Sequence, residues 1–208
     1  MTSLRSGVKL ILMKKLSTYL FLILFSFSTS SFADDISEFE IEGISIGKSL
    51  LDYMSEENIK TEIKNTRYIY TYLNEDFGEV YLYEGLQTYD SMSFFVKPND
   101  EKFLIYEVRG IISYTEDLNG CHKKQNEIVE EISKIFEDAK KSEKSYKSRH
   151  DPSGKSTKEK VIFTFNSGDE IQIVCANWEE NLRIKNNWNE GIGVIISTNE
   201  VLNWLGGN

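Results

Sequence analysis

The chain has 208 residues with 33 acidic and 24 basic side chains, two cysteines and a formal charge of −9 at pH 7. An acidic chain repels nucleic acid and anionic lipid surfaces, and no basic stripe with interleaved aromatic residues offsets this charge. The composition therefore excludes nucleic acid as a partner class, and we interpret the acidic balance as a solubility feature.

The first 33 residues have the pattern of a secretory signal peptide. Lys14 and Lys15 precede an apolar run over residues 16–27. Small residues then occupy the −3 and −1 positions of a cleavage site that lies between Ala33 and Asp34. We expect cleavage there and export to the periplasm or the medium. Translation would start at Met1 or at Met13.

The alternative interpretation of this segment is an uncleaved membrane anchor. The apolar run falls short of the ~20 residues that span a bilayer. No cysteine directly follows the cleavage site, so lipid attachment is not expected either. The sequence thus predicts no stable membrane anchor after cleavage.

Cleavage would leave residues 34–208 as a single exported domain, which is long enough to bury its own core. The removed segment carries four basic residues and no acidic residue, so the formal charge of the mature chain would be −13.

In an exported protein the two cysteines, Cys121 and Cys175, are expected to form a disulfide, because that compartment is oxidising. In the chain-entropy model, a disulfide that closes the loop between these two cysteines raises the free energy of unfolding by about 4 kcal/mol. The alternative is two free buried thiols.

The predicted elements begin with a short strand over 39–47, which ends at Gly47, and a helix from Lys48 that breaks and restarts at Ser55. Alternating tyrosines at 68, 70 and 72 then indicate a strand, and further strands are expected over 80–83, 92–96 and 103–114. A loop over 98–101 would join the last two.

The clearest predicted helix runs from Cys121 to about Lys141, with Asp117 or Asn119 as its cap. Its apolar residues at 121, 128, 129, 132, 135, 136 and 139 share one face at a spacing of 3.6 residues.

Residues 140–150 indicate an edge strand, and 161–165 with 170–176 indicate a hairpin. A strand over 193–197 and a final helical turn end the chain. This order predicts an α+β domain, in which an antiparallel sheet is packed on one face by the central helix and the broken N-terminal helix.

Three stretches of the sequence are similar to catalytic, nucleotide-binding or metal-binding motifs. Gly43-Ile44-Ser45-Ile46-Gly47 matches the nucleophile elbow G-x-S-x-G, which makes Ser45 the nucleophile of a candidate small serine hydrolase. The motif lies at the start of the mature chain, before the parallel sheet that a nucleophile elbow requires could be built. The only histidines that could serve as its base are His122 and His150. A turn between a strand and a helix is the preferred interpretation.

The tripeptide at 154–156 imitates the end of a P-loop, but residue 149 is arginine where that motif requires glycine. Cys121 and His122 are adjacent, and no C-x-x-C or H-x-x-x-H occurs. No catalytic residue, cofactor or metal site is therefore predicted.

Aromatic residues are the more informative feature, with 11 tyrosines and three tryptophans. They suit protein interfaces as well as cross-strand ladders, and the ladders are the simpler interpretation.

Residues 39–60, 121–136 and 151–178 together resemble a family of small exported proteins of marine alphaproteobacteria. The resemblance covers most of the mature chain, implies that the two cysteines are a family feature, and transfers no catalytic residue. At the level of fold only, the order of elements is similar to the outer-membrane assembly lipoproteins of the BamE/SmpA type and to proteinaceous β-lactamase inhibitors.

The function expected from these observations is a non-enzymatic periplasmic or secreted binding or inhibitor module with a protein partner in the cell envelope. The alternatives are the Ser45 hydrolase and a small-ligand carrier, which needs an enclosed apolar pocket of several hundred Å³.

Overall fold

The computed structural model describes residues 36–70, 72–149, 151–186 and 188–207. In chain order the elements are η1 (Ile36–Glu38), η2 (Leu50–Asp52), α1 (Glu56–Ile69), β1 (Gly78–Leu82), β2 (Ser91–Val96), β3 (Ile105–Ser113), α2 (Leu118–Ile135), β4 (Lys140–Lys147), β5 (Thr157–Thr164), β6 (Glu170–Asn177), α3 (Glu180–Asn186), β7 (Gly191–Ser197) and α4 (Asn199–Gly207). The strands form one antiparallel sheet in the order β1-β2-β3-β7-β6-β5-β4. The predicted α+β class is confirmed.

One face of this sheet, the helical face, carries the core. Strand registers align one residue from each of six strands in a row across it, and every member is at most 1% exposed: Val80, Phe94, Val108, Ile196, Ile171 and Phe163. Because side chains alternate along a strand, the residues between these face the other way. We call that side the polar face; it includes Glu79, Glu107, Arg109, Gln172 and Lys160.

Helix α2 packs on the helical face against β6 and β7. Asp117 caps it by accepting a hydrogen bond from the backbone N–H of Gly120 at 2.8 Å. The helix ends at Ile135, earlier than predicted, because the backbone leaves the helical conformation at Phe136. A disulfide joins Cys121 to Cys175 on β6, with the Cα atoms 6.0 Å apart, so the predicted pairing is confirmed.

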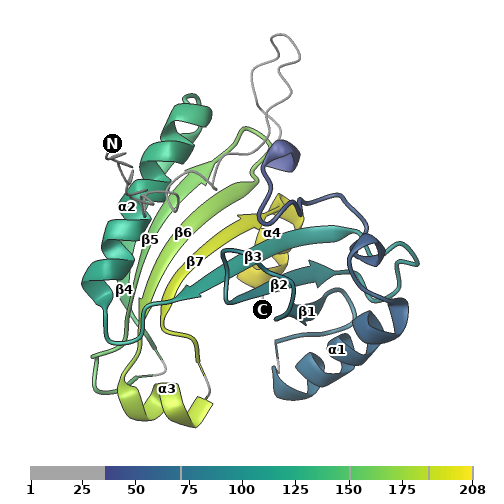
Figure 1. Cartoon of the computed structure of the whole chain (residues 1–208), viewed down its shortest axis with the longest axis horizontal. Coiled ribbons are helices and arrows are strands. Elements are labelled where there is room, and N and C mark those ends of the chain that lie inside the picture. Colours follow the sequence, from purple (N-terminus) through teal and green to yellow (C-terminus); the bar gives the residue numbers. More distant parts are fainter. Residues whose placement is uncertain (1–35, 71, 150, 187, 208) are drawn as a thin grey trace, which may run out of the picture. The chain divides into compact units, whose positions relative to one another are not determined.

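Helix α1 packs on the same face, as predicted. Ser55 caps it by accepting from the backbone N–H of Asn58 at 3.3 Å. The side chain of Ile63 lies so close to Gly78 of β1 that an added Cβ would meet it at 2.9 Å. Helix α4 lies on the other face, behind β3 in Figure 1, where Val201 and Trp204 pack against Phe95.

Two predicted strands are wrong. Residues 39–47 form a tight turn, in which Ile41 and Ile44 make a bridge and Gly43 has a φ of 77°. The alternating tyrosines do not form a strand either, because α1 continues to Ile69. Its capped start and its buried residues at 59, 63 and 66 follow the helical period, which outweighs the alternation.

The strand predicted over 140–150 is present as β4, at one edge of the sheet. Its lysines at 140, 141, 144 and 147 discourage pairing with another edge strand. Among the described residues no helix is long and apolar enough to cross a membrane.

Candidate functional site

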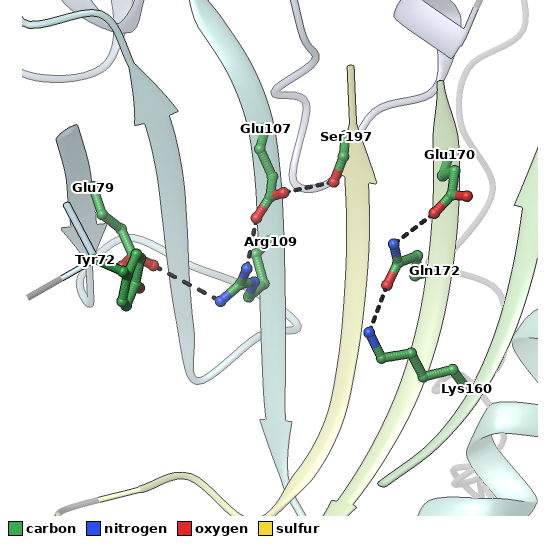
Figure 2. A network of polar contacts seen from close by, with 8 residues as sticks. All are labelled: Tyr72, Glu79, Glu107, Arg109, Lys160, Glu170, Gln172 and Ser197. Atoms are coloured by element: carbon green, nitrogen blue, oxygen red, sulfur yellow. Dashed lines mark hydrogen bonds and ion pairs between the residues drawn. The ribbon is translucent and has the colours of Figure 1, made fainter. Parts of the chain in front are cut away.

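The centre of the polar face holds one arginine between two buried carboxylates. Arg109 donates a hydrogen bond from Nη2 to Oε1 of Glu107 at 2.6 Å, and its Nη1 lies 3.8 Å from Oε1 of Glu79. Ser197 on β7 donates to the other oxygen of Glu107 at 2.6 Å. Tyr72 donates to Glu79 at 3.0 Å. Figure 2 shows these groups side by side across β1, β3 and β7.

Burial decides the electrostatics of this cluster. Glu79 and Glu107 are at most 1% exposed, whereas the Arg109 side chain is 27% exposed. Desolvation raises the pKa of Glu107, although Arg109 and Ser197 oppose that shift. Burial alone would lower the pKa of Arg109, but the two carboxylates raise it above its ordinary value. The Arg109 side chain therefore stays charged and partly exposed to solvent, beside two buried carboxylates.

A second polar chain crosses the neighbouring strands. Gln172 on β6 donates to Glu170 at 2.7 Å and accepts from the ammonium group of Lys160 on β5 at 3.1 Å. Figure 2 shows the Lys160 side chain reaching toward Gln172, where the dashed line marks this hydrogen bond. Because Gln172 is uncharged, it orients the Lys160 ammonium without neutralising it.

Aromatic rings border the basic end of this face. The Lys158 ammonium lies 4.8 Å from the ring centroid of Trp178, and that of Lys160 lies 5.8 Å from the ring of Tyr146. Desolvation, with the positive charges of Lys160 and Arg109, lowers the pKa of Lys158 to about 8. Within the described residues Lys158 forms no ion pair with a carboxylate.

Tyrosines gather at the opposite end, beside the edge strand β1. We call Tyr68, Tyr70, Tyr72, Tyr81 and Tyr83 the tyrosine patch, in which Tyr68 lies in the last turn of α1, the helix that packs on β1. The rings of Tyr81 and Tyr83 are stacked with centroids 5.8 Å apart, and those of Tyr70 and Tyr72 are 5.7 Å apart. Tyr68 is 93% exposed and Tyr83 65% exposed. The patch adjoins the charged centre through the hydrogen bond from Tyr72 to Glu79.

The predicted nucleophile lies elsewhere. Ser45 is 1% exposed, and its hydroxyl has no hydrogen-bond partner among the described residues. The Nε2 atom of His122 lies 3.3 Å from a carboxylate oxygen of Glu159, and no contact joins that imidazole to Ser45 in the described part. Within the described residues no base forms a hydrogen bond with Ser45; the other histidine, His150, lies outside them.

Backbone amides of the loop around 154–156 already donate hydrogen bonds to a side chain of the same loop. The Asp151 carboxylate accepts hydrogen bonds from the backbone N–H groups of Ser153 and Ser156 at 2.8 and 2.7 Å. A loop that places a carboxylate on these amides is not built for phosphate. No group of three or more His, Cys, Asp or Glu residues in the described ranges is placed to hold a metal ion.

A surface depression of about 370 Å³ lies beside α4, between Phe77 and Trp204. Three carboxylates (Glu75, Asp76, Glu200) and Lys97 line much of it, and Lys97 pairs with Glu200 at 2.6 Å. This lining differs from the enclosed apolar pocket that a small-ligand carrier requires.

The sequence did not identify Glu79, Glu107 or Arg109 as site residues. The signal was present, because a strand with charged residues two positions apart commits both to one face, whereas apolar residues fill the other. The predicted cleavage site at Ala33 and Asp34 lies outside the described residues.

Comparisons with protein-family models, with curated proteins and with solved structures found no match to this chain.

Proposed function

We propose that this chain is an exported, non-enzymatic binding module that recognises a protein partner in the cell envelope through the tyrosine patch. The resemblance to small exported proteins of marine alphaproteobacteria is part of the same proposal. Export to the periplasm or the medium is supported by the disulfide between Cys121 and Cys175, because disulfides persist in oxidising compartments.

The observation that carries the proposal is the exposure of large side chains at the end of α1 and directly after the edge strand β1. Tyr68, Tyr83 and the adjoining Ile69 are all more than 60% exposed. Tyrosine supplies a large contact area at a low cost in side-chain entropy, and it is enriched where proteins bind each other. Monomeric proteins rarely leave such a surface uncovered without a use for it.

The surroundings of the patch make it more selective than an apolar surface alone. Its hydroxyl groups add polar contacts, and burial raises the pKa of Tyr72 and Tyr81, so both remain neutral donors. The strand β1 beside it is a sheet edge, whose backbone can pair with an extended segment of a partner. Aromatic anchors beside an edge strand are a common protein-recognition arrangement.

The test is affinity capture from the envelope of the producing cells with the mature domain. The Tyr68→Ser/Tyr83→Ser double variant is expected to lose the captured protein. The matched control, Ile135→Ser/Ile184→Ser, removes side chains that are 37% and 64% exposed elsewhere and should keep it. Equal capture by both variants would show that the patch is not the interface.

A further inference from the structure

A glycine interrupts the polar face at the centre of the sheet. Gly193 lies on β7, directly between Ile111 of β3 and Val174 of β6. A Cβ added at Gly193 would meet no atom within 4 Å, so the space above it is open. Its φ is not among the positive values of the described glycines, so the backbone does not require glycine here.

Neighbouring glycines show the contrast. At Gly191 an added Cβ would lie 2.2 Å from the backbone oxygen of Ile112, and at Gly110 it would lie 2.5 Å from the Tyr89 ring. Packing explains those two glycines. Glycine inside a strand weakens the strand, so one without a packing reason indicates a place where another molecule approaches closely.

Apolar side chains flank Gly193, and cationic side chains lie further along the same face of the sheet. Ile111 and Ile195 flank it and are only half-buried. Register places Lys160 in the same cross-strand row, with Lys144 next to it on β4. Lys158 follows one row further along, and Arg109 lies in the row on the other side.

These cations are close enough to affect one another. Arg109 and Lys144 help to lower the pKa of Lys160, although desolvation is the largest cause. Among the described residues, carboxylates pair with Arg109 but not with the three lysines. Glu79 and Glu107 compensate Arg109, and Glu170 acts on Lys160 from a distance. No described carboxylate forms an ion pair with Lys144, Lys158 or Lys160.

We infer that the space above Gly193 binds an amphipathic organic anion, whose apolar body lies on Ile111 and Ile195 and whose acidic group lies toward Lys158 and Lys160. A carboxylate or a phosphate would complete the charge balance that the protein leaves open. The rings of Trp178 and Tyr146 lie 4.8 and 5.8 Å from the ammonium groups of Lys158 and Lys160, respectively. This site is separate from the tyrosine patch and does not depend on the proposed protein partner.

The experiment is isothermal titration of the mature domain with decanoate and with decyl phosphate, which distinguish the two acidic groups. Decanol and decyltrimethylammonium are the neutral and cationic controls. Saturable binding of at least one anion is expected, with neither control binding as tightly. No saturable binding of either anion, or equal binding of decanol, would overturn the inference.

Two variants locate the site. Gly193→Leu fills the space and should weaken anion binding at least about tenfold, because the apolar body loses its place. Lys158→Gln should weaken it about tenfold, as expected for the loss of one charge-assisted hydrogen bond. Lys141→Gln on the helical side of β4 is the matched control and should bind like the wild type.

Thermal unfolding shows whether each variant is folded. Unchanged affinity in a folded Gly193→Leu variant would refute the site. The Tyr68→Ser/Tyr83→Ser variant should bind the anion normally, so a failure of the protein-binding proposal and a failure of this inference give different results.

Discussion

Replacing Arg109 by methionine should destabilise the domain by leaving two buried carboxylates without their cation. Glu107 would lose a hydrogen bond of 2.6 Å, and Glu79 would lose the charge that lies 3.8 Å away. Removing one partner of a buried pair costs roughly 3–5 kcal/mol. Because Arg109 is 27% exposed and water can partly replace it, we expect a value near the lower end, about 3 kcal/mol.

The loss should depend on pH in a defined direction. Burial already raises the pKa of Glu107 above its ordinary value, and removing Arg109 raises it further. A carboxyl whose folded pKa is raised favours the fold when protonated, and that contribution is lost as pH rises through the folded pKa. The deficit of Arg109→Met should therefore be smaller near about pH 5 than near about pH 7.5.

Urea unfolding followed by tryptophan fluorescence measures this free energy at each pH. The matched control is Arg109→Met with Glu79→Gln and Glu107→Gln, which removes the uncompensated charges and should recover much of the lost stability. A deficit below about 1 kcal/mol for Arg109→Met, the same at both pH values, would refute this view of the cluster.

Reducing the disulfide should lower the free energy of unfolding by about 4 kcal/mol, measured by urea unfolding with and without dithiothreitol; a loss below about 1 kcal/mol would contradict the chain-entropy argument. Lys158→Gln should stabilise the domain below about pH 8, because the cost of protonating a lysine with a lowered pKa builds up as pH falls from 10.5 to about 8 and is complete below that pH. The gain should disappear toward pH 10.5, the ordinary lysine value, and a gain that is constant with pH would exclude this cause. Gly110→Ala should cost about 2 kcal/mol because its Cβ would enter the Tyr89 ring, whereas Gly193→Ala should be neutral or slightly stabilising; equal thermal shifts would be inconsistent with the open space above Gly193.

Much of the fold could be predicted because local signals and packing agree. Helix α2 has a clear apolar period and a capping residue, and so does α1, which Ser55 caps. The hairpin β5–β6 has two alternating strands with suitable turn residues between them. The pairing of Cys121 with Cys175 followed from the predicted export to an oxidising compartment, and two cysteines allow only one intramolecular pairing.

The errors arose where short-range patterns competed. The tyrosines at 68–72 alternate, but the buried period of α1 decided the structure. The turn at Ile41–Ile44 required a positive φ at Glu42 as well as at Gly43, which no local signal indicates for a glutamate. Helix α3, at Glu180–Asn186, was missed because none of its residues is buried and it therefore has no apolar face.

Strand alternation could have placed Glu107 and Arg109 on one face, but the meeting of that pair with Glu79 could not be predicted, because it depends on register. Glu79, Glu107 and Arg109 are ordinary surface residues in composition, and only the pairing of β1, β2 and β3 places them together. The open space above Gly193 likewise depends on neighbours that are far apart in the chain.

Site-specific photo-crosslinking in the producing cells tests the proposed binding role most directly. A photoreactive phenylalanine would replace Tyr83 in the tyrosine patch or, as the control, Ile184 on α3, which is similarly exposed at 64%. The proposal predicts a discrete crosslinked protein at position 83 and none at position 184. Crosslinking at 184 but not at 83, or at neither position, would contradict a protein interface at the tyrosine patch.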